Sequence, residues 1–309
     1  MKIKLVIIVA FSVLAKFSFA QTDVDAIMMN KNQFCFGPMY SYSSWDHYWE
    51  GTLKRNNENL GTVSTKMFNV MGNWGITNNL NLMFSVPYVK TKATAGTLAG
   101  MKGIQDLSIY AKWRFLNASI GKAKLKLFAI AGFSTPLDNY VIDFLPLSVG
   151  LGSTNGIFRF QADYQYKKFT VTASTASWER SNVKIDRTSY YDTEMHYTNV
   201  VDMPNASQQQ LRAGYRGKYL IAEAILNKWT TKGGFDITRN NMPFPSNRMN
   251  STSLGVSAKY TIPSFTNLSI LAGTQYTVAG RNVGQSTQYY GGVFYAFYGN
   301  KKSKPQPKK

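Results

Sequence analysis

The stretch GNWGITNNLNLMFSVPYVK, residues 72–90, alternates bulky apolar and smaller or polar side chains. From Leu80 onward the bulky apolar residues occupy every second position, with Asn81, Met83 and Ser85 between them. A period of two is that of a β-strand with one face in apolar surroundings. Those surroundings are a protein core in a soluble β-sandwich and lipid in a membrane barrel, and the alternation by itself fits both.

Segments with the same period recur along the chain and predict about twelve strands, each near the ~9 to 11 residues that a tilted strand needs to cross a bilayer. No repeat period indicates a solenoid or propeller. The predicted strands are residues 36–48, 62–76, 80–88, 105–115, 124–134, 158–166, 169–177, 210–215, 220–228, 253–260, 268–278 and 288–298.

The connections between these strands alternate in length. Short ones, such as 77–79 and 167–168, alternate with generally longer ones, such as 135–157 and 178–209. Outer-membrane barrels have short periplasmic turns, long extracellular loops and aromatic residues near the strand ends. The sequence therefore predicts an all-β protein, a transmembrane antiparallel β-barrel of about twelve strands, with a soluble β-protein as the alternative.

The first twenty residues combine a basic start, an apolar run and a small residue before Gln21. This pattern is typical of an export signal that is removed. We therefore expect a signal peptide at residues 1–20, a periplasmic N-terminal segment at 21–34, the barrel at 35–298 and a disordered basic tail at 299–309. The expected location is the outer membrane of a Gram-negative cell.

The chain carries 35 Lys and Arg against 16 Asp and Glu, a formal charge of +19. The basic residues are scattered singly in a chain predicted to be exported, which argues against nucleic acid as the partner. The expected partners are outer-membrane lipid and small solutes, and the sequence indicates no oligomeric state. Cys35 is the single cysteine, so no internal disulfide is expected.

If the apolar phase faces lipid, the opposite phase lines the interior of the barrel. A lumen with excess positive charge favours anions or acidic small molecules. The alternative is that these side chains pair with one another and with the N-terminal segment to fill a closed interior. The predicted lumen-lining residues are Lys112, Arg114, Lys124, Lys126, Arg159, Asp163, Arg212, Glu223 and Lys259.

Candidates for chemistry are few. His47 follows Asp46 in a segment with nearby serines, and His196 lies among acidic residues of the longest predicted loop. A hydrolase on the barrel wall would need a serine and His47 to meet across strands. No motif for a metal, cofactor or phosphate is present in the sequence. We therefore predict that the protein is not an enzyme and has no cofactor or metal site, with a barrel-embedded hydrolase as a minor alternative.

Four segments carry a resemblance: GNWGITNNLNLMFSVPYVK, GMKGIQDLSIYAKWRF, AGFSTPLDNY and LGSTNGIFRFQADYQY. Together they resemble the outer-membrane transporter-like barrels named after the meta-pathway of phenol degradation. The resemblance implies passage of small, often aromatic, compounds and does not imply phenol. One departure is the basic tail that follows Phe297 and Tyr298, where many such barrels end on an aromatic residue.

These observations predict a porin-like channel or transporter for passive uptake of small, anionic or aromatic molecules. A barrel that conducts nothing and acts as a structural or surface-interaction protein through residues 178–209 is the competing function. The two differ in whether the lumen is open or plugged by residues 21–34.

Overall fold

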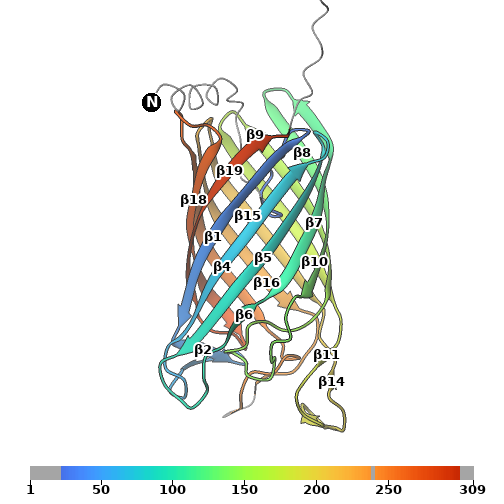
Figure 1. The fold of residues 1–309 in the computed structure, drawn as a ribbon, viewed down its shortest axis with the longest axis vertical. Coiled ribbons are helices and arrows are strands. Elements are labelled where there is room, and N and C mark those ends of the chain that lie inside the picture. The colour runs from blue at the N-terminus through green and yellow to red at the C-terminus, as the bar shows by residue number, and fades with distance from the viewer. Residues whose placement is uncertain (1–21, 238–240, 300–309) are drawn as a thin grey trace, which may run out of the picture.

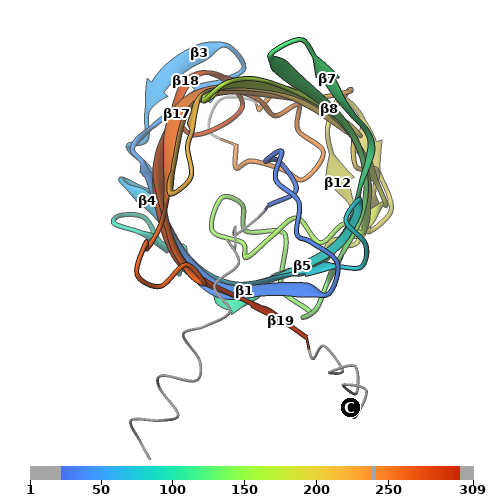
Figure 2. The ribbon, with the colours of Figure 1, turned by 90° about the horizontal axis from the view of Figure 1, so that it is seen from above.

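The computed structural model describes residues 22–237 and 241–299. The predicted signal peptide and residues 300–309 of the predicted tail lie outside the described residues. Twelve long antiparallel strands tilt around one axis and close into a barrel (Figures 1 and 2). They are β1 (Gln33–Trp45), β4 (Val63–Gly75), β5 (Leu80–Ala93), β7 (Asp106–Ile120), β8 (Ala123–Pro136), β9 (Asn155–Tyr166), β10 (Phe169–Arg180), β15 (Ala206–Arg216), β16 (Leu220–Thr231), β17 (Asn250–Thr261), β18 (Leu268–Arg281) and β19 (Thr287–Tyr298).

Each long strand pairs with its neighbours along the chain, and β1 closes the ring by pairing with both β4 and β19. Phe34, for example, lies opposite Trp74 on one side and Phe297 on the other. The predicted fold class, with twelve strands, is confirmed. Seven short strands lie in the connections: β2 (His47–Glu50), β3 (Leu53–Asn56), β6 (Lys102–Ile104), β11 (Val183–Lys184), β12 (Tyr190–Tyr191), β13 (Met195–His196) and β14 (Val200–Val201). Within the described ranges, no helix is long and apolar enough to span a membrane.

The two ends of the barrel differ in the length of their connections. The short-turn end, at the top of Figure 1, carries the connections 76–79, 121–122, 167–168, 217–219 and 262–267. The long-loop end carries 46–62, 94–105, 137–154, 181–205, 232–249 and the shorter 282–286. This sorting follows the predicted pattern.

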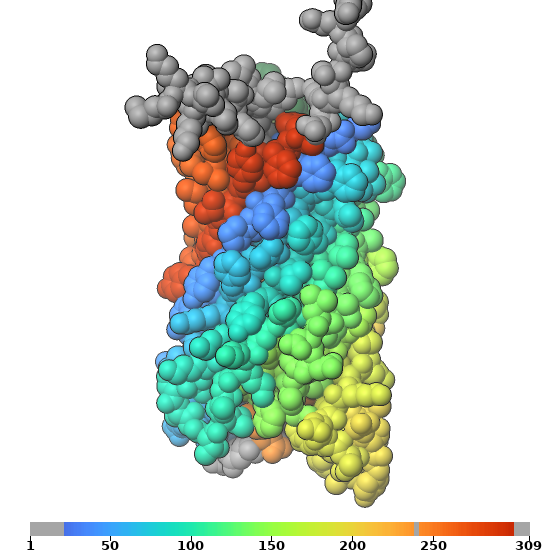
Figure 3. Space-filling model, viewed as in Figure 1, coloured from blue at the N-terminus to red at the C-terminus, as the bar shows by residue number. Residues whose placement is uncertain are grey.

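The exposure of neighbouring residues in the barrel wall accounts for the alternation in the sequence. On β9, Phe158 and Phe160 are 62% and 49% exposed, whereas Arg159 between them is 3% exposed and Gln161 is 0% exposed. The apolar face therefore points outward and the polar face inward, the reverse of a soluble sandwich. Aromatic rings stand on the outer surface of the wall in Figure 3, as expected for a surface in contact with lipid. In the opening stretch, Phe84 faces outward, while Asn81 is fully buried.

Several predicted strand ends were wrong; the strand predicted at 80–88 extends to Ala93, and the one predicted at 210–215 begins at Ala206. The strand predicted to end at Phe115 continues to Ile120, past a bulge between Arg114 and Leu116 that shifts the register. Phe115 and Leu116 are consequently both exposed on the outer face, which interrupts the alternation. The turn that follows is only Gly121 and Lys122, with Gly121 at a φ of 57°.

Candidate functional site

Residues 22–32, here called the N-terminal segment, enter the lumen from the start of β1 (Figure 2). Met29 packs beside Cys35 and Phe294 on β1 and β19. Ala26 packs on Phe128 and Ile130 of β8. The segment therefore crosses the lumen and is held on two sides by apolar contacts.

Ion pairs hold the same segment to the wall. The Asp25 carboxylate lies 3.2 Å from the ammonium of Lys112, which is fully buried and also donates to the carbonyl oxygens of Thr22 and Asp25. Deeper along the segment, the Asp23 carboxylate lies 3.2 Å from the guanidinium of Arg159. Two of the predicted lumen cations are thus paired with acids of the N-terminal segment.

A second group of charges lies on the wall near the short-turn end, and we call Lys126, Asp163, Arg212, Arg216 and Glu223 the wall cluster. Asp163 is fully buried and lies 3.0 Å from Arg216 and 3.6 Å from Lys126. Glu223 lies 2.8 Å from Arg212 and 3.4 Å from Arg216. Both carboxylates of the cluster are therefore already engaged by cations.

Arg216 was missed as a site residue, because the sequence placed it in a turn. It is the last residue of β15, in the same phase as Arg212. Continuing the inward alternation by two further residues along that strand would have found it.

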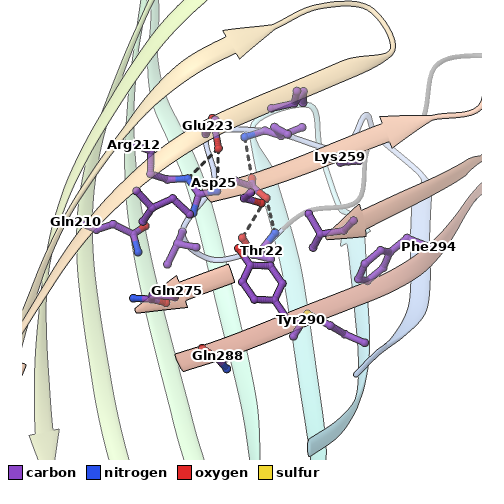
Figure 4. A pocket seen from close by; sticks show the side chains of 17 residues that line it. Thr22, Asp25, Gln210, Arg212, Glu223, Lys259, Gln275, Gln288, Tyr290 and Phe294 are labelled. Carbon is purple, nitrogen blue, oxygen red and sulfur yellow. Dashed lines mark hydrogen bonds and ion pairs between the residues drawn. The ribbon is translucent and has the colours of Figure 1, made fainter. Parts of the chain in front are cut away.

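A cavity of about 250 Å³ lies between the N-terminal segment and strands β15–β19 (Figure 4). We call it the central cavity. Figure 4 shows Asp25 reaching toward its middle, with Arg212 and Glu223 on one side and Tyr290 on the other. Its lining combines charges, side-chain amides and apolar groups: Arg212, Glu223, Lys259, Gln210, Gln275, Gln288, Ile225, Leu271 and Phe294 are among them.

A second cavity of about 300 Å³ lies at the short-turn end, and we call it the short-turn cavity. Arg114, Lys126 and Arg216 line it, together with residues 26–28 of the N-terminal segment. Ile27 and Ile221 line both cavities. The two cavities are therefore adjacent, with an isoleucine of the segment and an isoleucine of the wall at their common boundary.

Lys124 is the second residue of β8. Its side chain is exposed, and it lines neither cavity. Arg114 is also near the rim, where it donates to the side-chain oxygen of Asn79 at 2.7 Å and to the backbone carbonyl oxygen of Asn78 at 3.0 Å. The structure thus brings eight of the nine predicted residues to the two cavities or to the ion pairs, and leaves Lys124 outside.

The long-loop end is covered by packed loops. Residues 137–154, 232–237 and 241–249 lie within the outline of the ring in Figure 2. Leu147 is buried against Leu60 and Val63, and its carbonyl oxygen accepts a hydrogen bond from Thr91 at 2.6 Å. An apolar group that we call the loop cluster joins three loops: Ile142, Val183, Ile185, Val201, Met203 and Phe244.

Both histidines lie at the long-loop end. The His47 ring nitrogen lies 2.6 Å from the carboxylate of Asp46, its sequence neighbour. His196 stacks on Tyr190 with ring centroids 4.6 Å apart and contacts Asp192 at 3.0 Å. Among the described residues, no group of three His, Cys, Asp or Glu side chains is arranged to hold a metal ion.

The fold and the lumen define the class of protein, an outer-membrane-type β-barrel of twelve strands with its own N-terminal segment inside. Among solved structures, the chain is similar to the COG4313 outer membrane channel from Pseudomonas putida F1, with a TM-score of 0.68 and 15% identity over 91% of this chain and 100% of that one. At this identity the likeness establishes the fold.

Weaker likenesses are to the translocator domain of the autotransporter NalP from Neisseria meningitidis and to the KdgM porin in complex with disordered oligogalacturonate. Their TM-scores are 0.46 and 0.43, at 10% and 9% identity; they cover 89% and 84% of this chain and 91% and 99% of theirs.

No protein-family model matches the chain, and no curated protein matches it. The resemblance to the barrels named after the meta-pathway of phenol degradation therefore stays a prediction. What the comparison of structures establishes is coarser, the fold of outer-membrane barrels.

Proposed function

We propose that the protein is an outer-membrane channel through which small molecules, anionic or aromatic, diffuse passively beside the N-terminal segment. The short-turn end would face the periplasm. The observation that supports the proposal is that the central cavity and the short-turn cavity lie next to each other along the N-terminal segment and share Ile27 and Ile221 as lining residues. Passage would be by diffusion down a gradient, and the proposal includes no catalytic step.

The charges support a preference for anions or acidic solutes. Asp23, Asp25, Asp163 and Glu223 each lie within an ion pair, whereas Arg114 donates to neutral oxygens. A narrow passage lined by one sign of charge concentrates ions of the opposite sign. Aromatic compounds, which the resemblance implies, would have to pass the same isoleucine pair.

The alternative function is a barrel that conducts nothing. Its support is that the N-terminal segment crosses the lumen and that residues 137–154 are anchored across the long-loop end by Leu147. In that case the loop at 181–205 would act in surface interactions through its exposed residues, such as Tyr191 and Tyr197.

Planar-bilayer recordings separate these functions. The full mature chain should conduct with a reversal potential that indicates anion preference, and a variant lacking residues 22–30 should conduct several-fold more. Liposome swelling with anionic, neutral and aromatic solutes would then identify the solute class. A chain that inserts fully but shows no conductance and no swelling would contradict the channel and favour the alternative.

A further inference from the structure

We propose that the short-turn cavity is a binding site for a small organic carboxylate. Its carboxylate group would bind Arg114, Lys126 and Arg216, and its apolar body would lie on the N-terminal segment. The inference rests on the proposed function, since it names the class of solute that would bind at the short-turn end of the channel. Binding itself requires no conduction.

The short-turn cavity is positively charged. Its charged lining residues are Arg114, Lys126 and Arg216, all cationic. Lys126, Arg212 and Arg216 pair with the two carboxylates of Asp163 and Glu223, and Arg114 adds a fourth cation at the cavity. Two positive charges of this group are therefore not neutralised within it, and an anion in the cavity would lower the electrostatic energy.

The hydrogen bonds of Asp163 and Arg216 differ in how completely they are satisfied. Asp163 already accepts from the hydroxyls of Thr170 at 3.0 Å and Thr172 at 2.7 Å, in addition to its cations. It is saturated, because an ionised carboxylate offers about four lone-pair sites. The buried Nε of Arg216 has no hydrogen-bond partner among the described residues. A guanidinium binds a carboxylate with paired, directional hydrogen bonds, which suits this ligand group.

One side of the short-turn cavity is lined by apolar residues. Ala26, Ile27 and Met28 line it from the N-terminal segment, and Ile221 lines it from β16. A volume of about 300 Å³ equals roughly ten water molecules at ~30 Å³ each, which is room for a carboxylate with a short carbon chain. An inorganic anion would leave the apolar side in contact with water, so an organic anion gains more from burial.

Hexanoate binding to the full mature chain in detergent, measured by calorimetry, tests the site. Hexanoate should bind at least about tenfold more tightly than hexanamide, its neutral analogue, because the amide loses the charge-assisted hydrogen bonds. Sulfate should bind more weakly than hexanoate. Arg114→Gln should weaken hexanoate binding about tenfold. Among the described residues Arg114 has no acidic partner, so its replacement should not disturb the fold.

Lys124→Gln is the matched control, because Lys124 lies two residues from Lys126 on the same strand and is exposed outside the cavity. It should leave the affinity unchanged. Equal binding of hexanoate and hexanamide to the unmodified chain would overturn the inference. This comparison uses no variant, so it does not depend on whether the Arg114 variant folds. Equal losses in the Arg114 and Lys124 variants would overturn it as well.

The outcomes also separate this inference from the proposed function. A chain that conducts but does not bind hexanoate would retain the channel and lose the site. A chain that binds hexanoate but does not conduct would retain the site and lose the channel.

Discussion

The two ends of the barrel are obstructed by different interactions. The N-terminal segment, which enters from the short-turn end, is held in the lumen by buried ion pairs to Lys112 and Arg159. At the long-loop end, the loops are held together by the apolar loop cluster, in which Val201 is fully buried. Buried ion pairs depend on each partner being present, whereas apolar contacts depend on volume and are insensitive to charge.

The difference indicates which obstruction can change. Removing one acid from the N-terminal segment leaves a buried cation, which favours rearrangement of the segment. Removing a methyl group from the loop cluster leaves a small cavity and the same loop path. The inner obstruction should therefore respond to charge, and the outer one should behave as a folded cap.

The largest expected effect is at the wall cluster. Asp163→Ala would leave Arg216, Lys126, Thr170 and Thr172 facing a buried site without their acceptor. We expect the free energy of unfolding to fall by about 3–5 kcal/mol. Urea unfolding in lipid vesicles measures it, with Asp163→Asn as the control that retains the shape and loses less. A loss below about 1 kcal/mol would mean that lumen water replaces the carboxylate.

The next effect is at the long-loop end. Met203→Ala removes a side chain that is 3% exposed in the loop cluster, and such truncations typically cost about 2–5 kcal/mol. We expect faster proteolytic cleavage of residues 181–205, independent of salt, with an intact barrel. Met195→Ala, at a position 52% exposed, should leave the cleavage rate unchanged. A strong dependence on salt would argue that charges hold the loops.

A smaller effect is expected for the N-terminal segment. Asp25→Asn would remove the charge that pairs with Lys112, and a hydrogen bond to a charged group contributes about 1.5–3 kcal/mol. The population in which the segment is detached from the lumen wall should rise about tenfold or more. This would raise both the conductance and the anion preference in bilayer recordings. Adding Lys112→Met to Asp25→Asn should reverse part of the change. If both variants conduct as the unmodified chain does, apolar contacts of Met29 and Ala26 alone hold the segment.

The smallest effect concerns Asp236, in the loop 232–249. Its carboxylate accepts hydrogen bonds from Arg281 at 2.7 and 2.5 Å, which lower its pKa from 3.8 to about 2. The contribution to stability is therefore present above about pH 4 and is lost as the pH falls through about 2. It should stay under about 1 kcal/mol, because the side chain is 40% exposed and screened by solvent. An NMR titration measures the pKa, which should return toward 3.8 in Arg281→Gln.

Much of the barrel follows from local pattern. Period-two alternation predicted all twelve strands, and the order of inward and outward residues on β9 follows from the sequence alone. The exception at Phe115 has a physical cause, since a bulge adds one residue without changing the composition of the strand. Arg216 was missed for a similar reason, because strand ends are set by pairing with a neighbouring strand and not by the strand itself.

By itself, the sequence determined which face of each strand is apolar, because side chains alternate whatever the partner strand is. It left open whether residues 21–34 lie inside the barrel. Only the tertiary structure placed residues 22–32 in the lumen, by bringing Asp25 to Lys112 and Asp23 to Arg159, 87 and 136 residues apart along the chain. Such pairs have no local signature, since a charge in a short polar segment finds its partner only after the barrel closes around it.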